Sequence, residues 1–429
     1  MITWGISANS HDAALAVFDN DGLEFASHSE RFSGIKNDAH LNDKLIEYAR
    51  KWGEPDEIIW YERPFRKTLR QIRAGQGLRL AENNVNRYLR QYGISAPIRY
   101  TDHHLAHAAA GFYTSPFTEA SVVVIDSIGE FDTLSIWNAD GERGLKKIYK
   151  QTYPHSIGLW YSAFTQRLGL KPQEDEYILM GMAAYGDPLR FFNEILHEFF
   201  HPLDDDTFKQ IFFNKPTVKL KHNLHRGCQW WRPDLTSEQD MFDIAAAVQG
   251  IYAYILKYIS NWARWKSPSG NLVLMGGCAL NCSANGGIKS DWNDVWVMPN
   301  PGDAGSAIGA VLAHRKKFMP MPHVYTGYEI EGEYPVEEAL QELLTTGIVG
   351  VANGRAEFGP RAFGHRSLLA DPRGTDIKDR VNAIKRRQKF RPFAPAVLEE
   401  HAATYFDGYV NPFMQYTSTC TDPGLPAII

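Results

Sequence analysis

The chain has 429 residues, of which 44% are hydrophobic and 22% charged, and its formal net charge is −5. These proportions are ordinary for a globular protein, and the length allows two or three domains. The acidic balance argues against broad, non-specific binding of nucleic acid. No signal peptide and no apolar run of membrane-spanning length is visible, so we expect a soluble, cytoplasmic protein.

Four cysteines are too few for a disulfide framework in so long a chain. Cys278 and Cys282 lie four residues apart, but a zinc site would need two more ligands at a suitable spacing. We therefore expect small buried thiols in a reducing compartment.

The chain begins with alternating and apolar segments that predict strands, a turn after the first of them and a hairpin at Asn20-Asp21-Gly22. In chain order, the predicted strands are 2–6, 13–18, 23–29 and 57–61, with a helix at 43–52. Residues 65–92 are basic and helical. A solvated helix face explains them better than a nucleic-acid surface, because the chain as a whole is acidic.

The same strand-turn-strand-strand pattern recurs at 121–126, 133–137 and 145–150, which predicts an internal structural duplication. Asp12 and Asp126 each lie at a turn in one copy. Further along, a mostly helical region covers 153–264 and includes a long helix at 239–265. A strand at 271–275 and a helix at 303–314 follow.

Prolines and charged residues mark 321–335 as a linker between a first domain, 1–320, and a second domain, 336–429. The second domain begins with a helix at 336–344 and a strand at 348–352. Several of the arginines between 355 and 391 fall at glycine and proline corners, a placement typical of phosphate recognition. A solvated basic surface is the alternative.

The strongest candidate for a metal site is the pair His103 and His107, whose spacing puts both imidazoles on one helix face. Asp303, in a glycine-rich turn at a helix start, is the best third ligand. Two histidines and a carboxylate suit iron(II) or a similar divalent ion. Taken alone, such a pair is structural more often than metal-binding.

Three turns that each follow a strand could hold phosphate through their backbone N–H groups: 7–12, 126–130 and 276–281. Ordinary hairpin turns are the alternative for any one of them. Three such turns in a chain with an internal duplication indicate two related subdomains that close on a nucleotide.

Motifs along the whole chain resemble those of the NodU/CmcH-type O-carbamoyltransferases. In order, they are His11-Asp12-Ala13-Ala14, His103-His104-Leu105-Ala106-His107-Ala108, Asp126 with Gly129-Glu130, Met180 to Gly186, Gly276 to Asn281, Gly302-Asp303-Ala304-Gly305, Phe358-Gly359-Pro360-Arg361-Ala362 and Arg391-Pro392-Phe393-Ala394-Pro395. The resemblance implies an α/β protein. Its N-terminal domain would be a duplicated actin-like, RNase H-like fold, similar to the tRNA threonylcarbamoyl transferase, and a YrdC-like domain would follow.

The resemblance also implies the chemistry. The YrdC-like domain would join carbamoyl phosphate and ATP, with Mg²⁺ possible, into carbamoyl-adenylate. The N-terminal domain would pass the carbamoyl group to the hydroxyl of a small molecule, a sugar or a hydroxylated nucleoside or nucleotide. The implied residues are His103, His107 and Asp303 for Fe²⁺ or another divalent metal, His11 and Asp12 at the transfer site with either as the base, Asp126, Gly129, Gly277 and Asn281 at the nucleotide, and Arg361, Lys385 and Arg391 at carbamoyl phosphate and the adenylate phosphate.

Two departures from the family pattern stand out. Ser127 occupies a position where the family usually has glycine. Family members also continue beyond the equivalent of Leu425-Pro426-Ala427, so we expect a partial YrdC-like domain. A second polypeptide could complete it, the chain could be cut, or the first step could be lost. A tRNA-modifying threonylcarbamoyl transferase and an inactive nucleotide-binding subunit of a larger complex stay open as rival functions.

Overall fold

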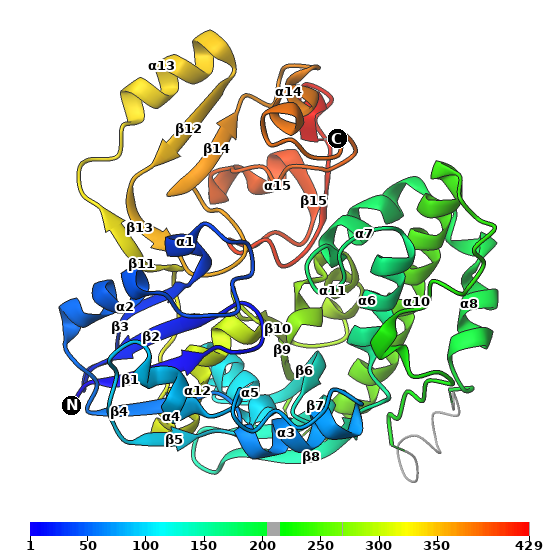
Figure 1. The fold of residues 1–429 in the computed structure, drawn as a ribbon. Coiled ribbons are helices and arrows are strands. Elements are labelled where there is room, and N and C mark those ends of the chain that lie inside the picture. The colour runs from blue at the N-terminus through cyan, green and yellow to red at the C-terminus, as the bar shows by residue number, and fades with distance from the viewer. Residues whose placement is uncertain (204–214, 268, 429) are drawn as a thin grey trace.

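The computed structural model describes residues 1–203, 215–267 and 269–428, and it consists of two lobes below a C-terminal module (Figure 1). Each lobe is built on one five-stranded sheet. The sheet of lobe I contains β1 (Thr3–Ser7), β2 (Ala14–Phe18), β3 (Leu23–His28), β4 (Glu57–Trp60) and β5 (Ile98–Tyr100). The sheet of lobe II contains β6 (Glu119–Gly129), β7 (Asp132–Asp140), β8 (Gly144–Thr152), β9 (Asn271–Met275) and β10 (Asp294–Val297).

The two sheets have the same topology, which confirms the predicted duplication and the α/β class. The order is β3-β2-β1-β4-β5 in lobe I and β8-β7-β6-β9-β10 in lobe II. In each, the central strand pairs antiparallel with the strand that follows it and parallel with the fourth strand. The central strands are almost entirely buried, as expected for a sheet covered on both faces.

Two helices, α5 (His103–Thr114) and α12 (Ser306–Arg315), pack against each other and belong to the core of lobe I. Small residues allow the close approach. A Cβ on Gly309 would lie 1.9 Å from the Ala106 oxygen, and a Cβ on Gly5 would lie 1.9 Å from the Ala307 oxygen. This packing fixes the start of α5 beside the turn that precedes α12.

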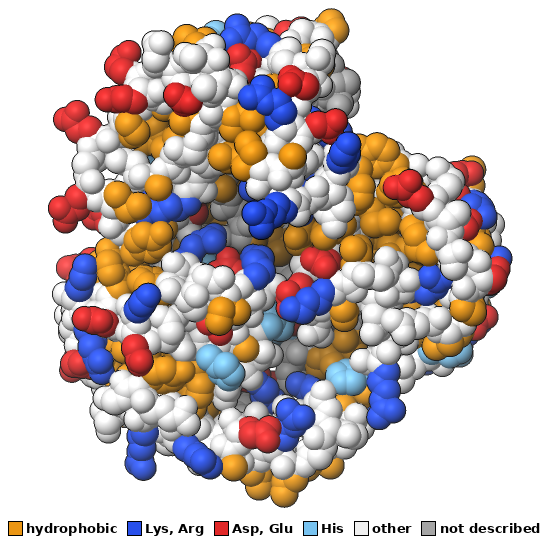
Figure 2. All heavy atoms as spheres, turned by 45° about the horizontal axis from the view of Figure 1, so that its top comes forward, with side chains coloured by type: hydrophobic (Ala, Val, Ile, Leu, Met, Phe, Trp, Pro, Cys, Tyr) orange, Lys and Arg blue, Asp and Glu red, His pale blue; other side chains and the backbone are white. Residues whose placement is uncertain are grey.

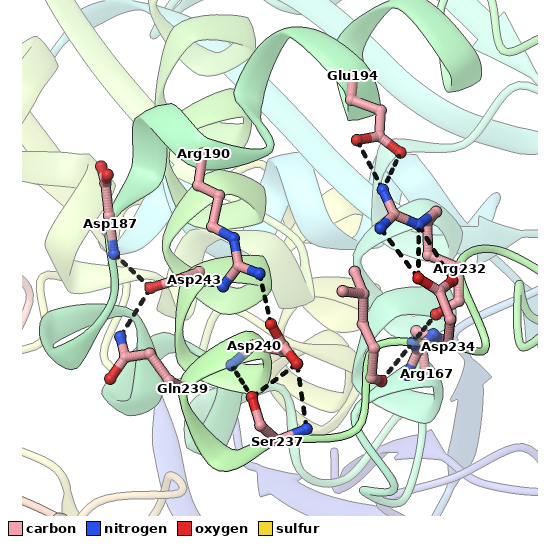
Figure 3. A network of polar contacts seen from close by, with 11 residues as sticks. Arg167, Asp187, Arg190, Glu194, Arg232, Asp234, Ser237, Gln239, Asp240 and Asp243 are labelled. Atoms are coloured by element: carbon pink, nitrogen blue, oxygen red, sulfur yellow. Dashed lines mark hydrogen bonds and ion pairs between the residues drawn. The ribbon is translucent and has the colours of Figure 1, made fainter.

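Helices also form an outer layer on lobe II: α6 (Ile157–Arg167), α7 (Glu176–Met182), α8 (Phe192–Phe199), α10 (Glu238–Lys266) and α11 (Cys282–Lys289). The long helix predicted at 239–265 is therefore confirmed. It begins with a capping box in which the Ser237 hydroxyl and the Asp240 carboxylate satisfy each other's backbone N–H groups. Arg190 pairs with Asp240 at 2.6 Å and with Asp243 at 2.8 Å, which ties the segment before α8 to α10 (Figure 3).

The basic segment 65–92 is only partly helical. It contains α3 (Pro64–Arg73) and α4 (Val85–Arg90), while α1 (Glu30–Ser33) and α2 (Asp43–Ala49) precede it. Gly75 and Gly77 have φ angles of 73° and 81°, a conformation that ends α3. Lys67 and Gln71 of α3 are buried, so this helix does not present a purely solvated face.

The C-terminal module has three two-stranded sheets: β11 (Tyr325–Ile330) with β13 (Gly354–Glu357), β12 (Ile348–Ala352) with β14 (Arg366–Ala370), and β15 (Phe406–Gly408) with β16 (Ser418–Cys420). Its helices are α13 (Val336–Thr346), α14 (Ile377–Ile384) and α15 (Ala402–Tyr405). The predicted linker thus contains a strand, β11. It forms because it pairs with β13 and because the Thr326 hydroxyl donates to the Ala26 oxygen of lobe I at 3.1 Å.

Two further expectations concern the whole chain. All four cysteines are free, as predicted, and Cys228 and Cys282 are buried while Cys278 and Cys420 are half-buried. Among the described residues, none of the helices has both the length and the apolar character needed to cross a membrane.

Candidate metal and transfer site

Four buried side chains meet where the two lobes join. His103 and His107 come from the first turns of α5, Asp126 from β6, and Asp303 from the short 3-10 helix Asp303–Gly305 that precedes α12. One ligand atom of each lies within 4.8 Å of the ligand atoms of the others. The structure therefore brings together the three predicted metal ligands and places Asp126 beside them as a fourth candidate.

The distances within this cluster fit a metal ion. The two Nε2 atoms of the histidines are 3.1 Å apart, and each lies 3.3 Å from Asp303 Oδ1. His103 Nε2 lies 3.4 Å from Asp126 Oδ2. Ligands at roughly 2.0–2.2 Å from one ion are separated by about this much.

The hydrogen-bonding state of the cluster points the same way. Asp303 Oδ1 is buried and has no hydrogen-bond partner among the described residues. Lone pairs that converge in this way can hold a cation between them, and a set of two histidines and two carboxylates suits iron(II) or another divalent ion.

Charges within the cluster keep its carboxylates ionised, the form in which they bind metals. Burial raises the pKa of Asp303, but His103 and His11 outweigh it and hold that pKa well below its usual value. Burial and Asp303 raise the pKa of Asp126, yet the hydrogen bond from His103 brings it to about 2. Burial lowers the pKa of His103, whereas Asp303 and Asp126 raise it well above its usual value.

Neighbouring residues hold the histidine rings in place. The Ser306 hydroxyl lies 3.3 Å from His107 Nδ1, and the Ser135 hydroxyl lies 2.7 Å from His104 Nδ1. Such contacts set the tautomer and orientation of a metal-binding ring. Gly129, which we predicted at the nucleotide, lies behind the rings, because a Cβ there would be 2.2 Å from His103 Cδ2.

His11 and Asp12 point to different places. His11 Nε2 lies 3.7 Å from Asp303 Oδ2, and the side chain is 40% exposed, so it is at the rim of the cluster. Burial lowers the pKa of His11, but Asp303, Asp12 and Asp126 together raise it. Asp12 Oδ1 instead accepts a hydrogen bond from His28 Nδ1 at 2.8 Å, and Asn300 donates to the other ring nitrogen of His28 at 2.9 Å.

The other residues predicted at the nucleotide lie beside the cluster on lobe II. The Gly277 N–H donates to Asp126 Oδ1 at 3.4 Å. Asn281 caps α11 and forms a reciprocal pair of 2.9 Å amide hydrogen bonds with Gln249. Since the Asn281 side chain already has these partners, any contact of it with a nucleotide stays a prediction.

Two of the three predicted phosphate-binding cations lie together. Burial, Arg387 and Arg391 lower the pKa of Lys385. Burial and Arg391 likewise lower the pKa of Arg387 to about 10. Within the described chain, Lys385, Arg387 and Arg391 have no ion pair to a carboxylate. Arg361 lies apart and donates to the Leu280 oxygen at 3.0 Å.

This basic cluster lies against lobe II. The Arg391 guanidinium lies over the Tyr177 ring at 4.5 Å, and the Tyr185 hydroxyl donates to the Phe390 oxygen at 3.0 Å. The face turned forward in Figure 2 is hollowed between the C-terminal module and the lobes, with Lys and Arg side chains along the hollow. Arg387 was not predicted as a site residue, although its position within Lys385–Arg391 was a usable signal.

Comparisons with known proteins find matches along most of the chain. A family model described as "Carbamoyltransferase N-terminus" matches residues 57–312, and one described as "Carbamoyltransferase C-terminus" matches residues 340–428. An uncharacterized Synechocystis protein, sll1178, is 33% identical over 94% of this chain and 76% of its own length. The nodulation protein NolNO of Sinorhizobium fredii is 30% identical over 92% of this chain.

The 3'-hydroxymethylcephem-O-carbamoyltransferase of Amycolatopsis lactamdurans is 26% identical over 95% of this chain and 81% of its own length. By contrast, this chain spans only 64% of the length of NolNO. Solved structures are more distant. The activator of the 2-hydroxyisocaproyl-CoA dehydratase from Clostridium difficile, with bound ADPNP, has a TM-score of 0.41 at 12% identity, covering 74% of this chain and 96% of that one.

Proposed function

Because the chain belongs to the carbamoyltransferase family, we propose that it is an ATP-dependent O-carbamoyltransferase. It would form carbamoyl-adenylate from carbamoyl phosphate, ATP and water, with release of phosphate and pyrophosphate. It would then transfer the carbamoyl group, with release of AMP, to a hydroxyl of a small molecule, a sugar or a hydroxylated nucleoside or nucleotide. The observation that supports this most directly is the buried His103, His107, Asp126 and Asp303 cluster, with His11 at its rim.

The first half-reaction is assigned to the C-terminal module, which we propose to be YrdC-like. Lys385, Arg387 and Arg391 have no ion pair to a carboxylate among the described residues, and burial together with neighbouring positive charge lowers the pKa of Lys385 and of Arg387. Such a cluster stabilises negative charge that develops on a phosphate leaving group. Arg361, at the junction with lobe II, would hold the adenylate phosphate, and ATP would enter with Mg²⁺.

The second half-reaction is assigned to the cluster between the lobes. His103, His107 and Asp303, with Asp126 as a fourth ligand, would hold Fe²⁺ or another divalent ion. When bound, such an ion supplies Lewis acidity toward the carbamoyl oxygen or the leaving phosphate. His11 would take the proton of the acceptor hydroxyl at Nε2. Asp12 is the weaker candidate for the base, because His28 already occupies its Oδ1 at 2.8 Å.

The C-terminal module has a small core, formed by Ile377, Val381 and Ala427, and a row of exposed apolar residues on α13. The exposed residues are Val336, Leu340 and Leu344, which are 59%, 49% and 63% exposed. These features support the proposal that a further polypeptide segment, like the additional length of the relatives, completes the adenylate-forming site.

The test is AMP formation that depends on carbamoyl phosphate. Purified, Fe²⁺-loaded protein, supplied with a polypeptide corresponding to the remaining length of the relatives, is mixed with ATP and carbamoyl phosphate. If neither pyrophosphate nor AMP forms, the proposal fails. If metal is bound tightly but nothing turns over with any acceptor, the chain is instead a nucleotide-binding subunit.

The two half-reactions can be separated by one variant. His11→Ala should slow carbamoyl transfer by roughly 10²- to 10⁴-fold, the usual contribution of a general base, and leave ATP–pyrophosphate exchange unchanged. His401→Ala, a change at an exposed position of the C-terminal module, is the matched control. Equal transfer rates in the two variants would remove His11 from the mechanism.

A further inference from the structure

A cavity of about 480 Å³ opens on the metal cluster between the two lobes. Its floor includes His11, Asp126 and Asp303. Its walls come from α3 and the segment after it, from α6, and from the 3-10 helix Leu224–Arg226. The wall residues that the argument uses are Lys67, Arg70, Gln76, Arg79, His225 and Arg226. This volume is sufficient for a ligand of the size of a sugar phosphate or a nucleotide.

The residues assigned to the carbamoyl donor lie mostly outside this cavity. None of the residues that we assign to the adenylate, apart from Asp126, lines this cavity: Gly129, Gly277, Asn281, Arg361, Lys385 and Arg391 all lie outside it. The cavity therefore reaches the metal cluster without being lined by these donor residues. A two-substrate transfer requires a second approach for the acceptor.

The charge of the cavity indicates what the acceptor carries. Among the described residues that line it, four are cations, and the only carboxylates are those of the metal-cluster residues Asp126 and Asp303. Lys67 is neutralised by Glu62 at 2.7 Å. Arg79 pairs with Glu82 at 3.5 Å. Both side chains are well exposed, so solvent screens this pair and it contributes little to the charge of the cavity.

Arg70 and Arg226 are the two wall cations with no ion pair among the described residues. Gln76 links the lobes here, since its Oε1 accepts from Arg70 at 3.0 Å and its Nε2 donates to His225 Nε2 at 2.9 Å. His225 then carries its proton on Nδ1. That atom and Arg70 Nε are buried and have no hydrogen-bond partner in the part of the chain that the structure describes. Burial, Arg70 and Arg226 all lower the pKa of His225, which reports a positive local field.

We propose that this cavity is the acceptor site and that it takes a phosphomonoester with a free hydroxyl group, such as a sugar phosphate or a nucleoside monophosphate. The phosphate lies at Arg70 and Arg226, and the hydroxyl lies at His11. Arginine suits this role because its planar fork matches phosphate oxygens. This assignment rests on the proposed O-carbamoyl transfer.

The transfer step balances with these groups. The acceptor oxygen forms a bond to the carbamoyl carbon, and the bond from that carbon to the adenylate phosphate oxygen breaks. AMP leaves with the electron pair, and the hydroxyl proton passes to His11 Nε2. The phosphate of the acceptor takes no part in bond making and serves only to place the hydroxyl.

Binding by the full chain tests the proposal without any turnover. Isothermal titration calorimetry compares uridine 5'-monophosphate with uridine, glucose 6-phosphate with glucose, and inorganic phosphate alone. We expect at least one phosphomonoester to bind tenfold or more tightly than its unphosphorylated partner. The phosphomonoester that binds more tightly shows whether the acceptor is a nucleoside monophosphate or a sugar phosphate. Equal binding of both members of each pair, or no binding at all, overturns the proposal, as does binding only of a single-stranded oligonucleotide.

Variants then locate the binding. Arg226→Ala alters an exposed side chain and Arg70→Gln removes a half-buried charge, and each should weaken phosphomonoester binding about tenfold or more. Arg73→Ala, an exposed arginine of the same helix that does not line the cavity, is the control. If Arg70→Gln fails to fold, Arg226→Ala decides alone, and unchanged affinity in it overturns the proposal. Lack of AMP formation would instead refute the transferase function, because these titrations contain neither ATP nor carbamoyl phosphate.

Discussion

Gly129→Ala provides a sharp test of how the metal cluster is supported. The added Cβ would lie 2.2 Å from His103 Cδ2, 2.7 Å from His104 Cδ2 and 2.8 Å from His103 Cγ. Since non-bonded carbons prefer roughly 3.5–4.0 Å, the His103 ring must move by more than about 1 Å. Metal sites tolerate displacements of only about 0.2 Å in their ligand distances. The backbone of Gly129 needs no positive φ, so the effect is steric alone.

We expect Gly129→Ala to weaken binding of Fe²⁺ or Co²⁺ by at least about tenfold, and to lower the free energy of unfolding by about 1–3 kcal/mol through overpacking. Calorimetric metal titration and urea denaturation measure the two effects. Gly287→Ala is the matched control, because a Cβ there meets nothing within 4 Å and it lies in helix α11. Wild-type metal affinity in Gly129→Ala would refute the placement of His103 in a metal site.

Three further changes test the same centre. Ser306→Ala removes the contact with His107 Nδ1 and should weaken metal binding about 10- to 100-fold with little effect on folding, whereas the exposed Ser283→Ala should change neither in the same titration. Asp126→Asn should weaken metal binding more than Ser306→Ala does, and an equal or smaller loss would show that Asp126 is not a ligand. Burial, and then His103, hold the pKa of His104 well below 6.5, so His104 stays neutral in the fold while the unfolded chain protonates. The free energy of unfolding of the apoprotein should therefore fall by up to about 1.4 kcal/mol per pH unit below pH 6.5 relative to that of His104→Asn, and parallel pH profiles would contradict this.

Much of the fold could be predicted because its signals are local. Strands β6 and β9 each contain a continuous apolar run, and α10 has an N-terminal cap followed by a long amphipathic stretch. The strand β11 was missed because a short segment with charges and glycine forms a strand only when β13 and lobe I pair with it. That pairing depends on tertiary packing, which the local sequence does not encode.

The site was predictable to the extent that helix geometry determines it. The four-residue spacing of His103 and His107 is sufficient to bring their Nε2 atoms to 3.1 Å. Asp126 joins this cluster because of where β6 ends relative to α5. That arrangement depends on how the two lobes pack together. The same is true of Gly129, whose lack of a side chain serves the His103 ring. In both cases, a turn typical of phosphate binding is also a turn that supports the candidate metal ligands.

Net charge was the weakest guide to what the protein binds. A net charge of −5 argues against a broad polyanion-binding surface. The net value nevertheless averages over two local clusters of positive charge. Lys385, Arg387 and Arg391 lie in the C-terminal module, where Arg391 contacts Tyr177 of lobe II, whereas Arg70 and Arg226 border the cavity that opens on the metal cluster. Positive groups at two separate places are what the proposed reaction between two phosphorylated substrates needs, because each phosphate is then held away from the atoms that react.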